Sequence, residues 1–297
     1  MVVLTKKSQA ARVNLWGKFR AYWTLIKSLQ TALLLITGLA GYMSARCPVT
    51  TWRTLLALAV SLFLAISGST VLNMVYDRDI DAAMKRTTKR PLPSGQVKVN
   101  EAWLIGVSLS TLGVGWALIL SPPYGMIVFA GLVFDVVVYT IWLKRRTPWS
   151  VIWGGISGGM PALAGRTLGT GHIDLIGLLL ALAVLLWIPT HIMTFSIKYA
   201  DDYRRAGVPV FPNTYGERTT RLFIGVSTAA AVIVMLVAIW LIGLSWCCLF
   251  GAIGLSMILL GFTIASVLHR SPKLNFALFK MASLYMLGSM GLIMAGI

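Results

Sequence analysis

Long apolar runs separated by short polar loops dominate the chain. Nine of these runs are near the ~20 residues that a membrane-spanning helix requires. They cover residues 22–43, 53–76, 102–120, 124–143, 149–168, 173–196, 222–243, 246–268 and 275–296. The loops between them, such as 121–124 and 243–246, leave no room for a soluble domain. The pattern therefore predicts an all-α membrane protein, in which residues 1–297 form a single bundle of nine transmembrane helices.

The composition supports this class. Hydrophobic residues make up 57% of the chain and charged residues only 12%, a balance typical of membrane proteins. The first apolar run has full length and lacks a small-residue cleavage site. It is therefore predicted to be a retained helix rather than a signal peptide.

The positions of the basic residues predict the orientation. All of the 26 Lys and Arg residues except Arg46, Arg53 and Arg166 lie at the N-terminal end, early in the first run, or in loops that share its side of the membrane. Cytoplasmic loops are enriched in Lys and Arg. We therefore expect a multi-pass protein of the cell membrane with a basic cytoplasmic segment at 1–21.

The net charge of +17 is mostly this topology signal. It also favours contact with anionic membrane lipid and with an anionic substrate. Nucleic-acid binding can use such charge, but here the basic residues are dispersed among membrane loops, so no nucleic-acid partner is expected.

The first candidate site lies at the end of the second apolar run, where three of the nine acidic residues fall within positions 77–81. On a helix, Asn73, Asp77 and Asp81 share one face, and Asp79 points away from it. Carboxylates at membrane depth are costly unless they are hydrated, paired or metal-bound. Oxygen ligands in this arrangement suit Mg²⁺, which takes further ligands from phosphate oxygens.

A basic loop follows this stripe at residues 85–95. Its Arg86 and Arg90 could bind a diphosphate through the planar guanidinium group. An ordinary positive-inside loop is the alternative. The neighbouring aspartate stripe favours the diphosphate interpretation.

The second candidate site is the pair Asp201 and Asp202, which follows the sixth apolar run on the same side of the membrane. The second and sixth helices run in the same direction, so both acidic clusters can face one cavity. Metal ions between two such clusters can neutralise a diphosphate leaving group and so help to form an allylic cation. A membrane cavity would accommodate a prenyl tail and keep water from the cation. The sequence thus indicates a Mg²⁺-dependent enzyme acting on an isoprenoid diphosphate, with its active site facing the cytoplasm.

Other polar positions allow two interpretations each. Asp135 is either a functional carboxylate or a structural hydrogen-bond partner. Tyr139 is either a ring that stabilises a carbocation or an interfacial anchor. His191 either contacts a polar acceptor or is structural. The glycines at 154–159 are better explained by close helix packing than by phosphate binding.

These motifs resemble the UbiA-type intramembrane prenyltransferase superfamily over essentially the whole chain. Its Asn-x-x-x-Asp-x-x-x-Asp motif corresponds to Asn73, Asp77 and Asp81. Within the superfamily, the closest resemblance is to the branch of protohaem IX farnesyltransferases, or haem O synthases. The segments that match this branch are 73–81, 90–95, 139–148 and 201–209. The chain departs from it at Pro189-Thr-His-Ile192 and at Lys27-Ser-Leu29.

The resemblance implies transfer of a farnesyl group from farnesyl diphosphate to the vinyl group of haem B, with Mg²⁺ as the only cofactor. It assigns Mg²⁺ and diphosphate to Asn73, Asp77, Asp81, Asp201 and Asp202. The phosphate charge would be met by Arg86, Arg90, Lys144 and Lys198. Tyr139 would face the allylic cation, and His191 could ligate the haem iron.

Two alternatives remain open at this point. One is a prenyltransferase of the same superfamily that uses an aromatic or glycerol-lipid acceptor. The other is a membrane transporter with ionisable residues along its pathway. Transporters often place their sites at the midplane between inverted repeats. Here both acidic clusters lie at one membrane face on parallel helices, which argues against alternating access.

Overall fold

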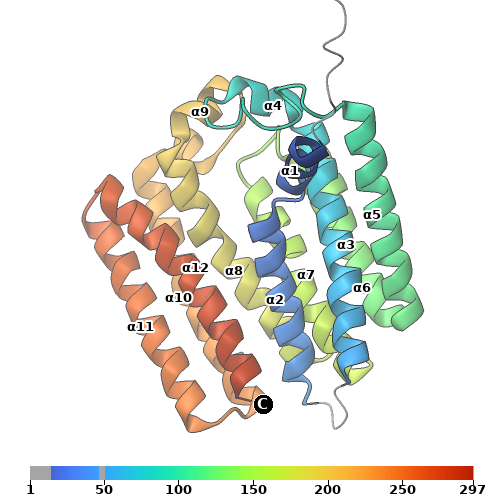
Figure 1. The fold of residues 1–297 in the computed structure, drawn as a ribbon. Coiled ribbons are helices and arrows are strands. Elements are labelled where there is room, and N and C mark those ends of the chain that lie inside the picture. The colour runs from blue at the N-terminus through green and yellow to red at the C-terminus, as the bar shows by residue number, and fades with distance from the viewer. Residues whose placement is uncertain (1–14, 47–50, 297) are drawn as a thin grey trace, which may run out of the picture.

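The computed structural model describes residues 15–46 and 51–296, in which every regular element is a helix. The long helices lie side by side in one bundle, with the short helices α1, α4 and α9 at one end and the C-terminus at the other (Figure 1). The elements are α1 (Leu15–Leu25), α2 (Ser28–Ser44), α3 (Trp52–Tyr76), α4 (Arg78–Ala83), α5 (Val99–Leu120), α6 (Pro122–Val133), the π-helix η1 (Phe134–Leu143), α7 (Ser150–Thr170), α8 (Leu175–Lys198), α9 (Ala200–Arg205), α10 (Phe211–Ile242), α11 (Trp246–Leu268) and α12 (Pro272–Ala295).

Within the described residues, seven helical stretches are long and apolar enough to cross a membrane: α3, α5, α6 continued by η1, α8, α10, α11 and α12. Helices α1 and α2 form an eighth if the 51° bend between them lies within one span. Helix α7 occupies the place of the predicted fifth segment, but it is not among the helices that meet this criterion. The all-helical membrane architecture is confirmed, whereas nine spans and a cytoplasmic N-terminus stay predictions.

The first predicted segment differs in detail from the structure. Its helix begins at Leu15 and breaks before Ser28, because Lys27 adopts a left-handed backbone conformation with φ 44°. The hydroxyl of Thr31 donates to the carbonyl of Ile26 at 2.7 Å, which satisfies an acceptor released by the break. Most of the predicted basic segment, residues 1–14, lies outside the described residues.

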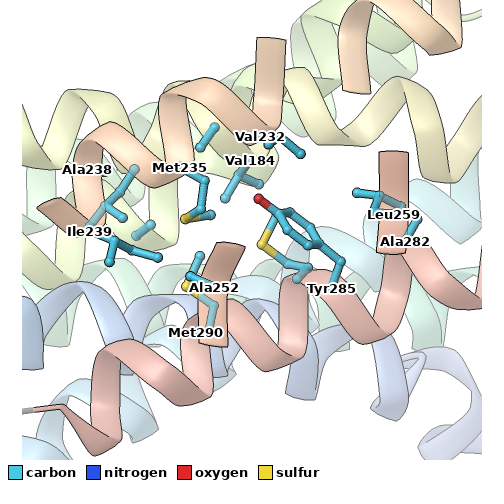
Figure 2. Packing of buried hydrophobic residues seen from close by; sticks show 14 of the residues in the cluster. Val184, Val232, Met235, Ala238, Ile239, Ala252, Leu259, Ala282, Tyr285 and Met290 are labelled. Carbon is cyan, nitrogen blue, oxygen red and sulfur yellow. The ribbon is translucent and has the colours of Figure 1, made fainter. Parts of the chain in front are cut away.

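The largest buried cluster joins α8, α10, α11 and α12. Figure 2 shows Tyr285 of α12 pointing into it, among aliphatic and methionine side chains that include Val184 and Met235. Lipid tails are as apolar as these side chains, so the hydrophobic effect does not drive the helices together within a membrane. Close van der Waals packing between the helices must therefore stabilise such a bundle.

Small residues allow that packing at α7. A Cβ on Gly165 would come within 1.9 Å of the Gly38 carbonyl of α2, and one on Gly159 within 2.5 Å of the Ala181 carbonyl of α8. The packing interpretation of the glycines at 154–159 is therefore confirmed. At the end of α7 that is remote from α4, the buried Arg166 pairs with Asp174 at 2.6 Å and donates to the Ser44 carbonyl at 2.7 Å.

Candidate active site

The first acidic cluster lies where α3 passes into α4. Asp77 has φ −85° and ψ 3° and separates the two helices, so residues 73–81 are divided between the end of α3 and α4. The chain still folds compactly there, because the Asp77 amide bonds the Asn73 carbonyl and the Asp81 amide bonds the Asp77 carbonyl.

The three aspartates of this cluster, Asp77, Asp79 and Asp81, have different surroundings. Asp77 and Asp81 are 5% and 3% exposed, whereas the Asp79 side chain is 66% exposed. Arg145 holds Asp79 at 2.6 Å and its hydrogen bonds lower the pKa of that carboxyl below the usual value. The structure thus separates Asp79 from the other two, as the sequence predicted.

Each of the two buried carboxylates has its own cation. Lys144, which follows η1, forms an ion pair with Oδ2 of Asp77. Arg90 contacts both carboxylate oxygens of Asp81 at 2.8 Å. Buried charges are tolerated when they are paired in this way. Two of the predicted phosphate-binding residues, Arg90 and Lys144, therefore lie against the carboxylates.

Oδ1 of Asp77 is buried and has no hydrogen-bond partner within the described part of the chain. An acceptor of this kind is rare in folded proteins and calls for an explanation such as an ion. Asn73, one turn earlier, donates from Nδ2 to Asp135 at 2.8 Å and accepts from Thr140 at 2.5 Å. The structure therefore brings Asn73, Asp77 and Asp81 to one end of α3.

Tyr139 borders the same cluster. Its ring lies 5.4 Å from Nζ of Lys144. It also fills the space left by the missing side chain of Gly154, since a Cβ there would come within 2.9 Å of the ring. Tyr139 thus lies between the Asp77–Lys144 pair and α7.

Arg86 occupies an aromatic box rather than an open phosphate position. Its guanidinium lies 4.9 Å from the Phe195 ring and 5.5 Å from the rings of Tyr199 and Tyr203. It also donates to the Tyr203 hydroxyl at 3.3 Å. Cation–π contacts of this kind are worth about 0.5–2 kcal/mol each. The box fastens the loop after α4 to the end of α8 and to α9.

The two aspartates of the second cluster have different surroundings. Asp202 is 7% exposed and pairs with Arg205. Burial raises its pKa, but Arg205 and the backbone amides of Arg86 and Lys85 outweigh burial, so the net pKa lies below the usual value. The Asp201 side chain is 83% exposed and pairs with Arg204 at 3.1 Å. The structure thus brings Asp202, and not Asp201, against the loop of the first cluster.

Two further predicted residues lie toward α12. Nζ of Lys198 is 4.0 Å from the Phe276 ring, so this cation faces α12 rather than the acidic groups. The ring of His191 is stacked between those of Trp187 and Phe279, with centroids 5.0 and 4.4 Å away. Its Nδ1 lies 3.2 Å from the Ser283 hydroxyl.

The oxygen atoms of the first cluster can be compared with the ligands that Mg²⁺ requires. Over residues 15–46 and 51–296, no group of three or more His, Cys, Asp or Glu residues is placed to hold a metal. Asp77 and Asp81 supply two carboxylates, Asn73 supplies an amide oxygen, and Oδ1 of Asp77 lacks a partner. Mg²⁺ commonly binds through one or two carboxylates together with waters and substrate phosphates. The donor set therefore fits this ion when a phosphate-bearing substrate is bound as well.

Several contacting residues were not identified from the sequence. Tyr203 follows Phe195 and Tyr199 at intervals of four, and this aromatic stripe could have been noticed. Thr140 gave no signal, because it follows Asp135 by five residues and an α-helical pattern does not relate such positions.

Comparison with known proteins agrees with this geometry. Residues 34–285 match the UbiA prenyltransferase family. A protoheme IX farnesyltransferase of Archaeoglobus fulgidus is 44% identical over 216 residues, which cover 73% of this chain and 76% of that protein. A protoheme IX farnesyltransferase of Pyrobaculum islandicum is 37% identical over 264 residues, which cover 88% of this chain and 92% of that protein.

Solved structures share the fold. A structure of digeranylgeranylglyceryl phosphate synthase superimposes with a TM-score of 0.77 at 21% identity, covering 94% of this chain and 98% of that chain. A UbiA homologue from Archaeoglobus fulgidus bound to GPP and Mg²⁺ superimposes with a TM-score of 0.68 at 16% identity, covering 93% of this chain and 99% of that chain. Such low identities speak for the fold alone. The identity to the two farnesyltransferases and the extent of the family match carry the assignment further: this chain is an enzyme of the UbiA prenyltransferase family.

Proposed function

We propose that this enzyme transfers a farnesyl group from farnesyl diphosphate to the vinyl group of haem B, with Mg²⁺, at the end of the bundle that carries α4 and α9. The observation that carries the proposal is the buried pair Asp77 and Asp81, each matched by a cation from another segment. The names of the relatives, protoheme IX farnesyltransferases, support the donor and the acceptor.

The donor end of the site is built from the first cluster. Asn73, Asp77 and Asp81 would hold Mg²⁺, which supplies positive charge that neutralises the diphosphate leaving group. Lys144 and Arg90 lie at the carboxylates, and both side chains are long enough to turn toward phosphate oxygens. Asp202 and the Arg86 box hold the basic loop against this end of the bundle.

The reaction breaks the bond between C1 of the farnesyl group and the diphosphate oxygen. The terminal vinyl carbon of haem B bonds to C1, and water adds to the adjacent vinyl carbon with loss of one proton. The products are the hydroxyethylfarnesyl haem, diphosphate and that proton. Tyr139, which lies beside the Asp77–Lys144 pair, would stabilise the allylic cation through its ring face.

The acceptor end of the site would include His191. Its stack with Trp187 and Phe279 offers a flat aromatic surface of the kind that suits a porphyrin. Because Ser283 engages Nδ1, Nε2 is the nitrogen that would ligate the haem iron. A metal-bound histidine usually has a hydrogen-bond partner on its other ring nitrogen.

Mass spectrometry of haem tests the proposal. The chain, expressed with haem B and farnesyl diphosphate, should yield farnesylated haem, and the purified protein should release diphosphate only with Mg²⁺. If haem is recovered unmodified while a phenolic acid or a glycerol lipid is prenylated, the acceptor assignment is wrong. Absence of Mg²⁺-dependent diphosphate release with any acceptor would contradict the donor assignment as well.

The acceptor role of His191 needs a separate comparison. His191→Ala should reduce formation of farnesylated haem more than it reduces binding of the prenyl diphosphate. His172→Ala serves as the control, since His172 is exposed and follows α7 at the opposite end of the bundle from α4. Equal effects of the two substitutions would remove His191 from the acceptor site.

The cytoplasmic position of the site also remains a proposal, supported by the placement of Lys and Arg residues. Single cysteines introduced in a background lacking Cys47, Cys247 and Cys248 can be labelled in intact cells. Positions 94 and 214 should be protected from an impermeant reagent, and positions 122 and 245 should react. Labelling at 94 or 214 would reverse the orientation.

A further inference from the structure

The element η1 is a ten-residue π-helix that continues α6 to the edge of the active site. π-helices are rare and mostly limited to a single turn, frequently at functional sites. The i→i+5 bonding reaches the end of the element, where the Lys144 amide bonds the Tyr139 carbonyl at 2.8 Å. A π-helix of this length is unusual, and we looked for contacts with the adjacent site that depend on its geometry.

The wider turn brings residues that are five apart onto the same side. Asp135 and Thr140 both contact Asn73, at 2.8 and 2.5 Å. Tyr139 and Lys144 form the next such pair, and Lys144 contacts Asp77. In an α-helix, positions five apart differ by about 140° around the axis at 3.6 residues per turn. The π-helical register therefore lets Asp135 and Thr140 both contact Asn73, and it places Tyr139 beside Lys144, which pairs with Asp77.

Asp135 has the most specific contacts among these residues. Its Oδ2 accepts hydrogen bonds from the Ser69 hydroxyl and from Nδ2 of Asn73. The Thr140 hydroxyl donates to Oδ1 of Asn73 at 2.5 Å and lies 2.8 Å from the backbone carbonyl of Asp135. Both ends of the Asn73 amide are therefore set by one turn of η1.

The chemistry of a carboxylate gives this contact a direction. Oδ2 of Asp135 accepts from Nδ2 of Asn73, and an amide has one donor end and one acceptor end. Asp135 therefore selects Nδ2 of Asn73 and turns Oδ1 to the other side. Oδ1 keeps a lone pair beyond the bond from Thr140, and an amide oxygen is a ligand that Mg²⁺ accepts.

We propose that Asp135 is a positioning residue, which uses the π-helical register of η1 to orient the Asn73 amide so that its oxygen is available to the metal–diphosphate site. The inference rests on the proposed role of Asn73 in that site. It gives a role to a membrane-depth carboxylate that the donor and acceptor assignments leave unused.

A metal-binding measurement tests the inference without turnover. Mn²⁺ serves as the probe, and its free fraction is followed by electron paramagnetic resonance with purified full-length protein and non-hydrolysable farnesyl thiodiphosphate. Asp135→Ala should weaken Mn²⁺ binding by about 10-fold, the lower end of the effect of outer-shell residues on metal affinity. Asp135→Asn, which can still accept but no longer selects one end of the amide, should lie between Asp135→Ala and the parent. Val137→Ala, on the half-exposed side of η1, is the control and should bind Mn²⁺ as the parent does.

A double-mutant comparison separates positioning from a general structural effect. If Asp135 acts through Asn73, the double variant Asp135→Ala/Asn73→Ala should bind Mn²⁺ no more weakly than Asn73→Ala alone. Multiplied effects of the two substitutions would overturn the inference. So would unchanged Mn²⁺ affinity in both Asp135 variants.

The outcomes also distinguish this inference from the proposed function. If the parent binds Mn²⁺ with the thiodiphosphate and the Asp135 variants bind it equally well, the positioning role fails and the donor site stands. If the parent and all variants bind no Mn²⁺ under these conditions, the donor site itself is wrong and the positioning role falls with it.

Discussion

The two acidic clusters look alike in sequence but are built differently. The carboxylates of Asp77 and Asp81 are buried and matched by Lys144 and Arg90, of which Lys144 is 67 positions away. Asp201 and Asp202 are paired with arginines only three positions further on, and Asp201 is largely exposed. The first cluster thus depends on the tertiary fold for its charge balance, whereas the second balances its charge within one short helix.

This difference indicates a division of labour. A buried carboxylate that depends on distant cations is costly to keep and is usually retained for a function. A local pair on an exposed helix contributes little, typically about 0–1 kcal/mol. We therefore expect the donor chemistry to depend chiefly on the first cluster, and Asp202 to act mainly by holding the basic loop in place.

The largest effect should come from the first cluster. Asp77→Asn and Asp81→Asn should each lower kcat/KM by about 100-fold or more, on the scale of losing one preorganised electrostatic contact. Asp79→Asn should change it by less than about 3-fold, because Asp79 is exposed and bound to Arg145. Diphosphate release by purified protein measures all three. Equal losses at the three positions would remove the distinction between buried and exposed carboxylates.

Within the second cluster, the two aspartates should differ. Asp202→Asn should lower activity by about 10-fold, since a hydrogen bond to a charged group is worth about 1.5–3 kcal/mol. Asp201→Asn should stay within about 2-fold of the parent. The same assay at several Mg²⁺ concentrations decides between the two roles. A greater Mg²⁺ requirement in Asp201→Asn would show that the second cluster binds metal directly.

Arg86 distinguishes charge from aromatic contact. Arg86→Lys should lower activity by about 5-fold, near the loss for Arg86→Ala, because Lys keeps the charge but loses the planar stacking that is worth ~1 kcal/mol. Phe195→Leu should reproduce part of the loss without removing a cation. Full activity of Arg86→Lys would show that the charge of Arg86 matters and its stacking does not, as expected for a phosphate ligand.

The smallest effect concerns pH. The pKa of Asp202 is lowered in the folded protein, so its ion pair stabilises the fold above the usual Asp range and this contribution is lost as the pH falls below about 4. Thermal unfolding in detergent should show Asp202→Asn less stable than the parent by about 1 kcal/mol, or roughly 2–4 °C in Tm, at pH 7 and at pH 5. The gap should close toward pH 3. A gap that persists there would mean that the contacts of Asp202 are independent of its charge.

Periodicity and charge placement predicted the apolar helices and the common end of the two clusters well. They failed where the backbone leaves the α-helix. No Pro or Gly marks the backbone breaks at Lys27 and Asp77, and the second one falls where the apolar run 53–76 passes into a charged segment. The π-helical register of η1 accompanies the contacts of Asp135 and Thr140 with Asn73, and a one-dimensional pattern does not contain such contacts.

The sequence indicates which charged residues belong to the candidate site, but it does not indicate which of them pair with one another. Asp77 and Asp81 were recognisable as unusual charges in an apolar chain. The pairing of Arg90 with Asp81, and the aromatic box around Arg86, arise because α4, the loop after it and α9 pack together. Side chains of opposite charge or complementary shape in one loop have several possible partners, and only tertiary packing selects among them.

Helix α7 has a consequence for how the protein enters the membrane. It contains Arg166 and several glycines, and a charged residue within a helix disfavours its partitioning from the translocon into lipid. Arg166 finds its counter-ion in Asp174, the residue that caps the start of α8. The turn between α7 and α8 therefore carries its own neutralising pair, and the two helices can insert as a hairpin. Biogenesis of this enzyme should then depend on α8 being synthesised before α7 is released from the translocon.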